Sequence, residues 1–150
     1  MEVLFLDAPF SGTVELSKDT LSYLKKKKYK TVALYASVQF VNNLETVRKQ
    51  LADNNIVDIT SHADRTHVKG QLLGCDNYHN SLNMSRDESK AVDCYLYVGD
   101  GKFHPLALVY VQKDMHEMKE IVCNDPMQKK MSLMGTADVK KILLRYRASL

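Results

Sequence analysis

The chain has 150 residues, of which 45% are apolar and 26% are charged, and its formal net charge is +3. This length and composition are typical of one globular domain with a core of its own. Much of the positive charge comes from the run Lys25–Lys28 together with Lys30, which ends an apolar-periodic segment and indicates the solvated end of a helix. Because no RNA-binding motif accompanies this run, we expect no direct contact with nucleic acid.

Apolar runs and cysteines narrow the class of protein further. The longest apolar run, Leu106–Val111, is far too short to cross a bilayer, so no membrane association is expected. Residues 1–4 lack the basic start of a signal peptide, which predicts a cytoplasmic protein. The cysteines are odd in number and widely spaced: Cys75, Cys94 and Cys123. Neither a disulfide framework nor a zinc site of the CxxC type fits this spacing.

The first part of the chain alternates between short apolar runs and amphipathic segments. Residues 3–6 form an apolar run that is typical of a buried strand. Ser17 is placed to cap a helix whose Leu21 and Leu24 face inward. The apolar run Thr31–Ala36 predicts a second strand.

The pattern then repeats once more. Asn42 or Asn43 is placed to cap a helix whose apolar face runs from Leu44 to Leu51, and residues 56–59 predict a third strand. This order is β-α-β-α-β. Strands that are separated by helices pair in parallel through right-handed crossovers, with helices covering both faces of the sheet.

The remaining residues extend the same plan. A polar stretch, residues 77–90, leads to a strong strand, Cys94–Val98. Leu106–Val111 is compatible with either a short helix or a strand, and residues 121–123 predict another strand. Thr136 is placed to cap a C-terminal helix. The sequence therefore predicts a single α/β domain over residues 1–150, with a mostly parallel sheet of four to five strands and helices on both faces.

Polar and glycine-rich residues follow three of these segments. They are Ser37-Val38-Gln39, Gly74-Cys75-Asp76, and the segment 99–105 with the sequence Gly-Asp-Gly-Lys-Phe-His-Pro. In open parallel sheets, ligands bind outside the carboxyl ends of the strands. These three loops are therefore the predicted site.

The same loops carry a family resemblance. Residues 70–75, Gly-Gln-Leu-Leu-Gly-Cys, and residues 95–106, which include the Gly-x-Gly-x-Phe-His-Pro motif, resemble the diphthamide synthase family. Ser37-Val38-Gln39-Phe40 is similar to the opening of the family's second domain, so the chain resembles the middle domain. The two motifs together, at this spacing, are specific, whereas either alone would be weak.

The resemblance implies a chemistry. Family members combine about three similar α/β domains, each of which gives one cysteine to a [4Fe–4S] cluster. The cluster binds and cleaves S-adenosylmethionine, and a 3-amino-3-carboxypropyl group is transferred to a histidine of translation elongation factor 2. By position, Cys75 matches the cluster ligand of the middle domain. Gly99, Gly101 and His104 match a loop near the cofactor.

The residues themselves suit these roles. Thiolate is the usual ligand of iron–sulfur clusters. Glycines allow close backbone approach, and the turn Gly99–Gly101 can present N–H groups to a carboxylate such as that of the methionine moiety. Gln39, Gln71 and His104 are candidates to hydrogen-bond the same ligand.

The chain departs from the family in length. It spans one domain, and the cysteines of the flanking domains are absent, so one copy cannot hold the cluster in the family manner. Completion would require other diphthamide synthase domains or subunits, or further copies of the chain itself. The alternative is a non-catalytic, stand-alone relic that binds a small ligand or a pathway partner. Quinolinate synthase is similar in its three-domain, three-cysteine plan, but its motifs are not found.

Overall fold

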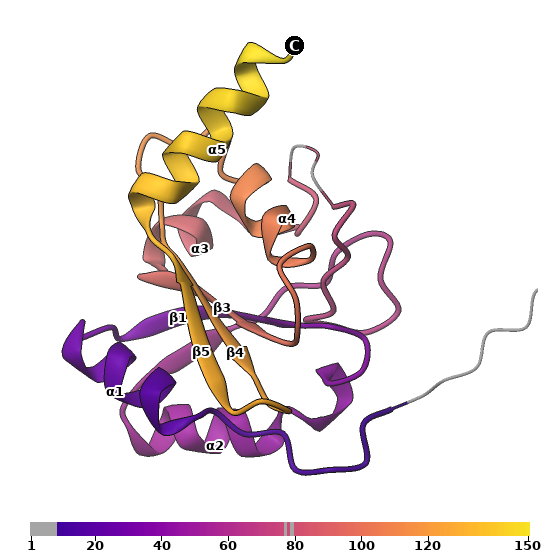
Figure 1. Ribbon diagram of the computed structural model, residues 1–150, viewed down its shortest axis with the longest axis vertical. Helices are drawn as coiled ribbons and strands as arrows, with labels where there is room; N and C mark the ends of the chain where they lie inside the picture. Colours follow the sequence, from indigo (N-terminus) through magenta and orange to yellow (C-terminus); the bar gives the residue numbers. More distant parts are fainter. Residues whose placement is uncertain (1–8, 77, 79) are drawn as a thin grey trace, which may run out of the picture.

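The computed structural model describes residues 9–76, 78 and 80–150. A five-stranded sheet with the strand order β2-β1-β3-β4-β5 runs through these residues (Figure 1). Its strands are β1 (Thr31–Ala36), β2 (Val57–Ile59), β3 (Cys94–Val98), β4 (Ile121–Asp125) and β5 (Lys130–Met134). The predicted strand at residues 3–6 lies outside the described residues. The prediction of a mostly parallel sheet with helices on both faces is confirmed.

Four of the strands are parallel because helical segments return the chain to the same end of the sheet. β1 pairs in parallel with β2 and β3, and β3 pairs in parallel with β4. β5 is antiparallel to β4 and follows it through a tight hairpin. In that hairpin, the Asp125 carboxylate accepts hydrogen bonds from the backbone N–H groups of Met127 and Gln128, and Lys129 has a positive φ of 52°. The sequence patterns did not predict β5.

Helices cover both faces of the sheet. Helices α1 (Lys18–Lys26) and α2 (Glu45–Asp53) pack on one face, and α3 (Arg86–Ala91), α4 (Pro105–Tyr110) and α5 (Thr136–Ala148) lie on the other side (Figure 1). Two apolar cores result, because alternate residues of each strand point to opposite faces. One core joins alternate β1 residues such as Leu34 to α1 and α2, and the other joins Tyr35 and its neighbours to α4 and α5.

Two of the three predicted caps are wrong. Ser17 does cap α1, since its side chain accepts a hydrogen bond from the Thr20 N–H at 3.2 Å. Asn42 and Asn43 instead lie in a 3-10 turn, η1 (Val41–Asn43), and α2 begins after Leu44 without a side-chain cap.

The third cap belongs to the C-terminal helix. α5 includes Thr136, and Gly135 is the residue that precedes the first turn. The Gly135 N–H donates to the Asp138 carboxylate at 3.0 Å, so an acidic side chain in the first turn of the helix provides a hydrogen-bond acceptor for the backbone at its N-terminus. The prediction of Thr136 as the cap was one residue late.

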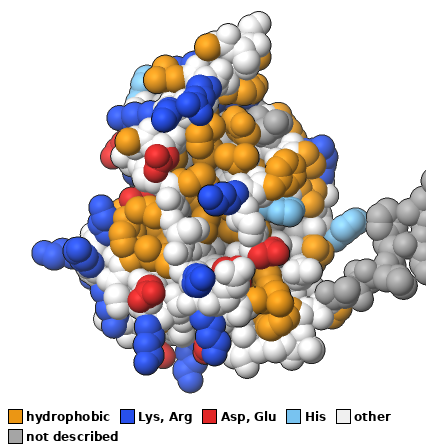
Figure 2. Space-filling model, in the orientation of Figure 1, with side chains coloured by type: hydrophobic (Ala, Val, Ile, Leu, Met, Phe, Trp, Pro, Cys, Tyr) orange, Lys and Arg blue, Asp and Glu red, His pale blue; other side chains and the backbone are white. Residues whose placement is uncertain are grey.

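Two further segments are helical. The segment that begins at Pro105 forms α4, where proline at the first helical position needs no N–H partner. α3 begins in the predicted polar stretch, ends one residue beyond it, and carries a reciprocal capping box between Ser85 and Glu88. Lys25–Lys28 are all exposed, as expected for a solvated helix end, and Figure 2 shows lysine and arginine side chains around the α1 and α2 side of the molecule. None of the described helices is both long enough and apolar enough to span a bilayer.

Candidate functional site

The predicted loops meet at one edge of the sheet because β1, β3 and β4 are parallel. The Ser37 N–H donates to the Val98 carbonyl at 3.1 Å, which joins the end of β1 to the end of β3. The Gly99 N–H donates to the Asn124 carbonyl at 3.0 Å and joins β3 to β4 in the same way. The loops that leave these strands therefore start side by side.

The segment that contains the Gly-Cys motif is attached to the end of β1. The Ala36 N–H donates to the Gly70 carbonyl, and the Leu72 N–H donates to the Ala36 carbonyl, both at 2.9 Å. Gly70 has a φ of +86°, a conformation that glycine adopts without strain. Gln71 forms a parallel bridge with Ala36, is 4% exposed, and accepts a hydrogen bond from the His67 N–H. The Gln71 side chain is therefore engaged within its own loop.

Phe103 joins the two motif loops. A Cβ atom built on Gly74 would lie 2.9 Å from Cζ of Phe103, with two other ring carbons closer still, so the ring covers the bare glycine backbone. Phe103 also contacts the His104 ring edge-to-face at 5.6 Å between centroids. The Phe103 side chain is 63% exposed. This contact places the Gly74-Cys75 loop beside the Phe103-His104 loop, as the sequence predicted.

The three cysteines differ sharply in accessibility. Cys75 is exposed, whereas Cys94 and Cys123 are buried. Burial raises the pKa of Cys123 to about 11, and burial followed by the charge of Glu120 raises the pKa of Cys94 well above its usual value. Both buried thiols therefore stay protonated at neutral pH and cannot reach a ligand at the surface. Within the described residues, no group of three or more His, Cys, Asp and Glu side chains could hold a metal ion.

The other predicted residues differ in their surroundings. Gly101 has a φ of +69° and open space where a Cβ would stand, so a ligand can approach its backbone closely. His104 is half-buried at the start of α4 and makes no side-chain cap. Gln39 is exposed on the loop after β1, and its carbonyl accepts a hydrogen bond from the Phe10 N–H at 3.2 Å.

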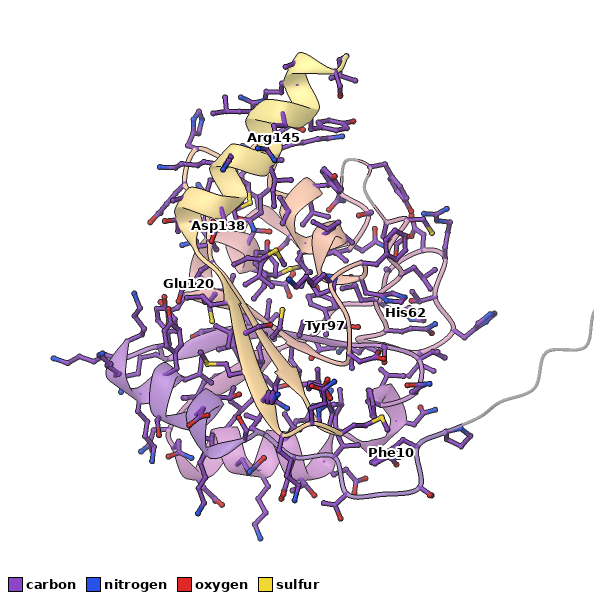
Figure 3. The ribbon with its side chains drawn as sticks, viewed as in Figure 1. Phe10, His62, Tyr97, Glu120, Asp138 and Arg145 are labelled. Carbon is purple, nitrogen blue, oxygen red and sulfur yellow. The ribbon has the colours of Figure 1, made fainter. Side chains whose placement is uncertain are left out.

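Two buried hydroxyl groups lie beneath this edge. Tyr97 is fully buried near the centre of the molecule (Figure 3), and Ser37 is 5% exposed. Their hydroxyls lie close to each other, but neither meets the geometry of a hydrogen bond with any described partner. Burial, together with the charge of Asp100, raises the pKa of Tyr97. A Cβ on Gly99, which directly follows β3, would lie 2.6 Å from Cζ of Tyr97 and would overlap this buried ring.

One residue that the sequence did not single out contacts the Cys75 loop directly. Arg65 donates from Nη2 to the Cys75 carbonyl at 2.6 Å and to Oδ1 of Asp76 at 2.9 Å. Asp76 is fully buried, so this ion pair is anchored in the fold. The only signal in the sequence was the position of Asp76 next to the candidate cysteine.

Comparison with known proteins bears on the fold and the family of the chain. The family model for diphthamide synthesis proteins matches residues 2–149. The chain belongs to the diphthamide synthesis protein family. A solved structure of Dph2 from Pyrococcus horikoshii with a 4Fe-4S cluster is similar, with a TM-score of 0.66 and 23% identity over 93% of this chain. A second Dph2 structure from the same organism has a TM-score of 0.61 and 22% identity over 86% of this chain. None of the curated proteins compared with the chain matches it.

These likenesses establish the fold and the family membership. The chain spans only 37% and 35% of the two Dph2 chains that it matches.

Proposed function

We propose that this chain supplies the Cys75 thiolate as one ligand of an iron–sulfur cluster in a diphthamide-synthesis assembly. The observation that carries the proposal is the difference in solvent exposure among the three cysteines, in a chain that belongs to this family. Cys75 is exposed beside the second motif loop, while Cys94 and Cys123 are buried in the core. The presence of a 4Fe-4S cluster in the similar Dph2 structure supports the choice of cofactor.

The donor set fits such a cluster only in part. One accessible thiol can hold one iron, and the described residues contain no further group that could complete a metal site. The remaining ligands must come from other diphthamide synthase domains or subunits, whether on another polypeptide, on a continuation of this one, or on further copies. When bound, the cluster would bind and cleave S-adenosylmethionine, with a histidine of elongation factor 2 as the acceptor of the 3-amino-3-carboxypropyl group.

The residues of this chain would shape one wall of that site. Phe103 covers Gly74 and presents an exposed aromatic ring next to His104. This ring would shield a ligand on Cys75 from water. The turn at Gly101 leaves open space for a ligand that approaches the backbone. We assign His104 and Gln39 as candidate hydrogen-bonding groups for S-adenosylmethionine, and we place the protein in the cytoplasm. Gln71 acts from beneath, by holding the loop that carries Cys75.

Anaerobic purification without any small thiol tests this proposal. Light scattering would give the mass of each fraction, and iron analysis and absorbance would show which fraction contains a cluster. We expect iron only in assemblies larger than one chain, and cleavage of S-adenosylmethionine only in those assemblies. A protein that stays colourless and monomeric after addition of iron and sulfide would favour the alternative, a stand-alone domain that binds a small ligand or a pathway partner.

A further inference from the structure

Arg65 is held in a fixed place by a buried carboxylate. Its Nε and Nη2 atoms both donate to Oδ1 of Asp76, at 3.2 and 2.9 Å, and Nη2 also donates to the Cys75 carbonyl at 2.6 Å. The guanidinium lies 5.3 Å from the centroid of the Tyr78 ring. A planar guanidinium makes these contacts from two nitrogen atoms in a fixed geometry, whereas a lysine ammonium would have to make them from a single nitrogen atom.

Asp76 is itself fixed, which makes the arrangement rigid. The Asp76 side chain is fully buried, and a buried carboxylate needs a charged or hydrogen-bonding partner. Its Oδ2 atom accepts from the Leu73 N–H at 3.4 Å, and its carbonyl accepts from the Ser81 hydroxyl at 2.9 Å. Hydrogen bonds therefore fix both the side chain and the backbone carbonyl of Asp76, the residue that follows Cys75.

We propose that Arg65 is a positioning residue for Cys75, which fixes the backbone of the cysteine and holds a permanent positive charge beside its thiol. This role rests on the proposed function, because its purpose is to present Cys75 to an anionic partner such as a sulfide-bridged cluster. The Arg65 guanidinium donates to the carbonyl of Cys75 itself, so its charge lies close to the residue that carries the thiol. About half of the Arg65 side chain is exposed, so solvent and salt partly screen its charge.

The inference predicts that Cys75 prefers anionic reagents. The reaction of the cluster-free protein with two disulfides would be followed at one pH: the dianionic dithiobis-nitrobenzoate and the neutral dithiodipyridine. The ratio of the two rates reports the local charge and cancels changes in the ionisation of the thiol itself. We expect Arg65→Gln to lower this ratio about threefold to tenfold at low salt, the size expected for removal of one charge near a dianion in water.

Two matched variants make the result decisive. Arg65→Lys should restore most of the ratio because it restores the charge. Arg48→Gln should leave the ratio unchanged, because Arg48 is also half-exposed and pairs with an aspartate, Asp58, outside the Cys75 loop. A Cys75→Ala sample shows that no other thiol contributes to the fast reaction. An unchanged ratio in a folded Arg65→Gln protein overturns the inference.

The cluster provides a separate readout. After anaerobic reconstitution with a small thiol present to complete the iron sites, loss of iron to a chelator should be several-fold faster in Arg65→Gln than in Arg48→Gln. Equal rates in the two variants would contradict the positioning role. If Cys75→Ala retains all of the iron, the proposed function fails, and the reagent ratios still decide whether Arg65 sets the charge at Cys75. The two failures are therefore distinguishable.

Discussion

Replacing Gly99 with alanine should destabilise the protein, although Gly99 lies in a motif whose glycines suggest ligand binding. A Cβ at this position would lie 2.6 Å from Cζ of Tyr97 and closer still to Oη, whereas non-bonded carbon atoms prefer about 3.5–4.0 Å. The Tyr97 side chain is fully buried and cannot swing away. Overpacking of this kind costs about 1–3 kcal/mol. For a chain of this size, the melting temperature should fall by roughly 2–12 °C.

Chemical and thermal unfolding of Gly99→Ala would measure this loss, and Gly74→Ala is the matched control. The Gly74 Cβ would also overlap a ring, that of Phe103, but Phe103 is exposed and can rotate into solvent. Gly74→Ala should therefore cost less than about 0.5 kcal/mol, as most surface substitutions do. The reasoning would be refuted if Gly99→Ala were as stable as the wild type, or if both variants lost the same stability.

Three other substitutions test the roles of buried hydroxyl and thiol groups. Tyr97→Phe should change stability by less than about 0.5 kcal/mol or increase it slightly, because the buried hydroxyl has no hydrogen-bond partner among the described residues. Tyr35→Phe should instead cost about 0.5–1.5 kcal/mol, because it removes the hydrogen bond to Ser61. Urea midpoints of the two variants test this, and a larger loss in Tyr97→Phe would contradict it. Burial raises the pKa of Cys123 from 9.0 to about 11. The protonated Cys123 thiol therefore contributes its full share of the folding stability below pH 9, and this share is lost as the pH rises to 11. The stability of Cys123→Ala should therefore fall less steeply than that of the wild type over this window, by up to about 2 kcal/mol, and parallel pH profiles would rule this out.

Much of the fold follows from short apolar runs. The strands Thr31–Ala36 and Cys94–Val98 have the bounds that the sequence predicts, because both are central strands with helices on each face and are therefore apolar throughout. β5 was missed because it is an edge strand with mostly exposed side chains and is defined by its pairing with β4. α3 buries no residue, so it lacks an apolar face, although its capping box between Ser85 and Glu88 was readable in the sequence.

Long-range contacts explain the errors in the caps and in the site. Asn43 does not cap α2, because its side chain donates to the Phe10 carbonyl at 2.9 Å, a contact between residues far apart in the sequence. The pairing of Arg65 with Asp76 and Cys75 depends in the same way on how the loop folds back on itself. The sequence located the motif loops, since strand ends and glycines are local signals. It could not identify the neighbours that fix those loops.

The most direct test of the central claim is the cluster content of Cys75→Ala compared with that of Cys123→Ala. Both proteins would be reconstituted anaerobically with iron and sulfide, with a small thiol present to complete the iron sites that this chain does not fill. Cys123→Ala should retain the absorbance and iron content of the wild type, because its thiol is buried and protonated. Cys75→Ala should lose both. Retention of the full iron content by a folded Cys75→Ala protein would contradict the assignment of Cys75 as a cluster ligand.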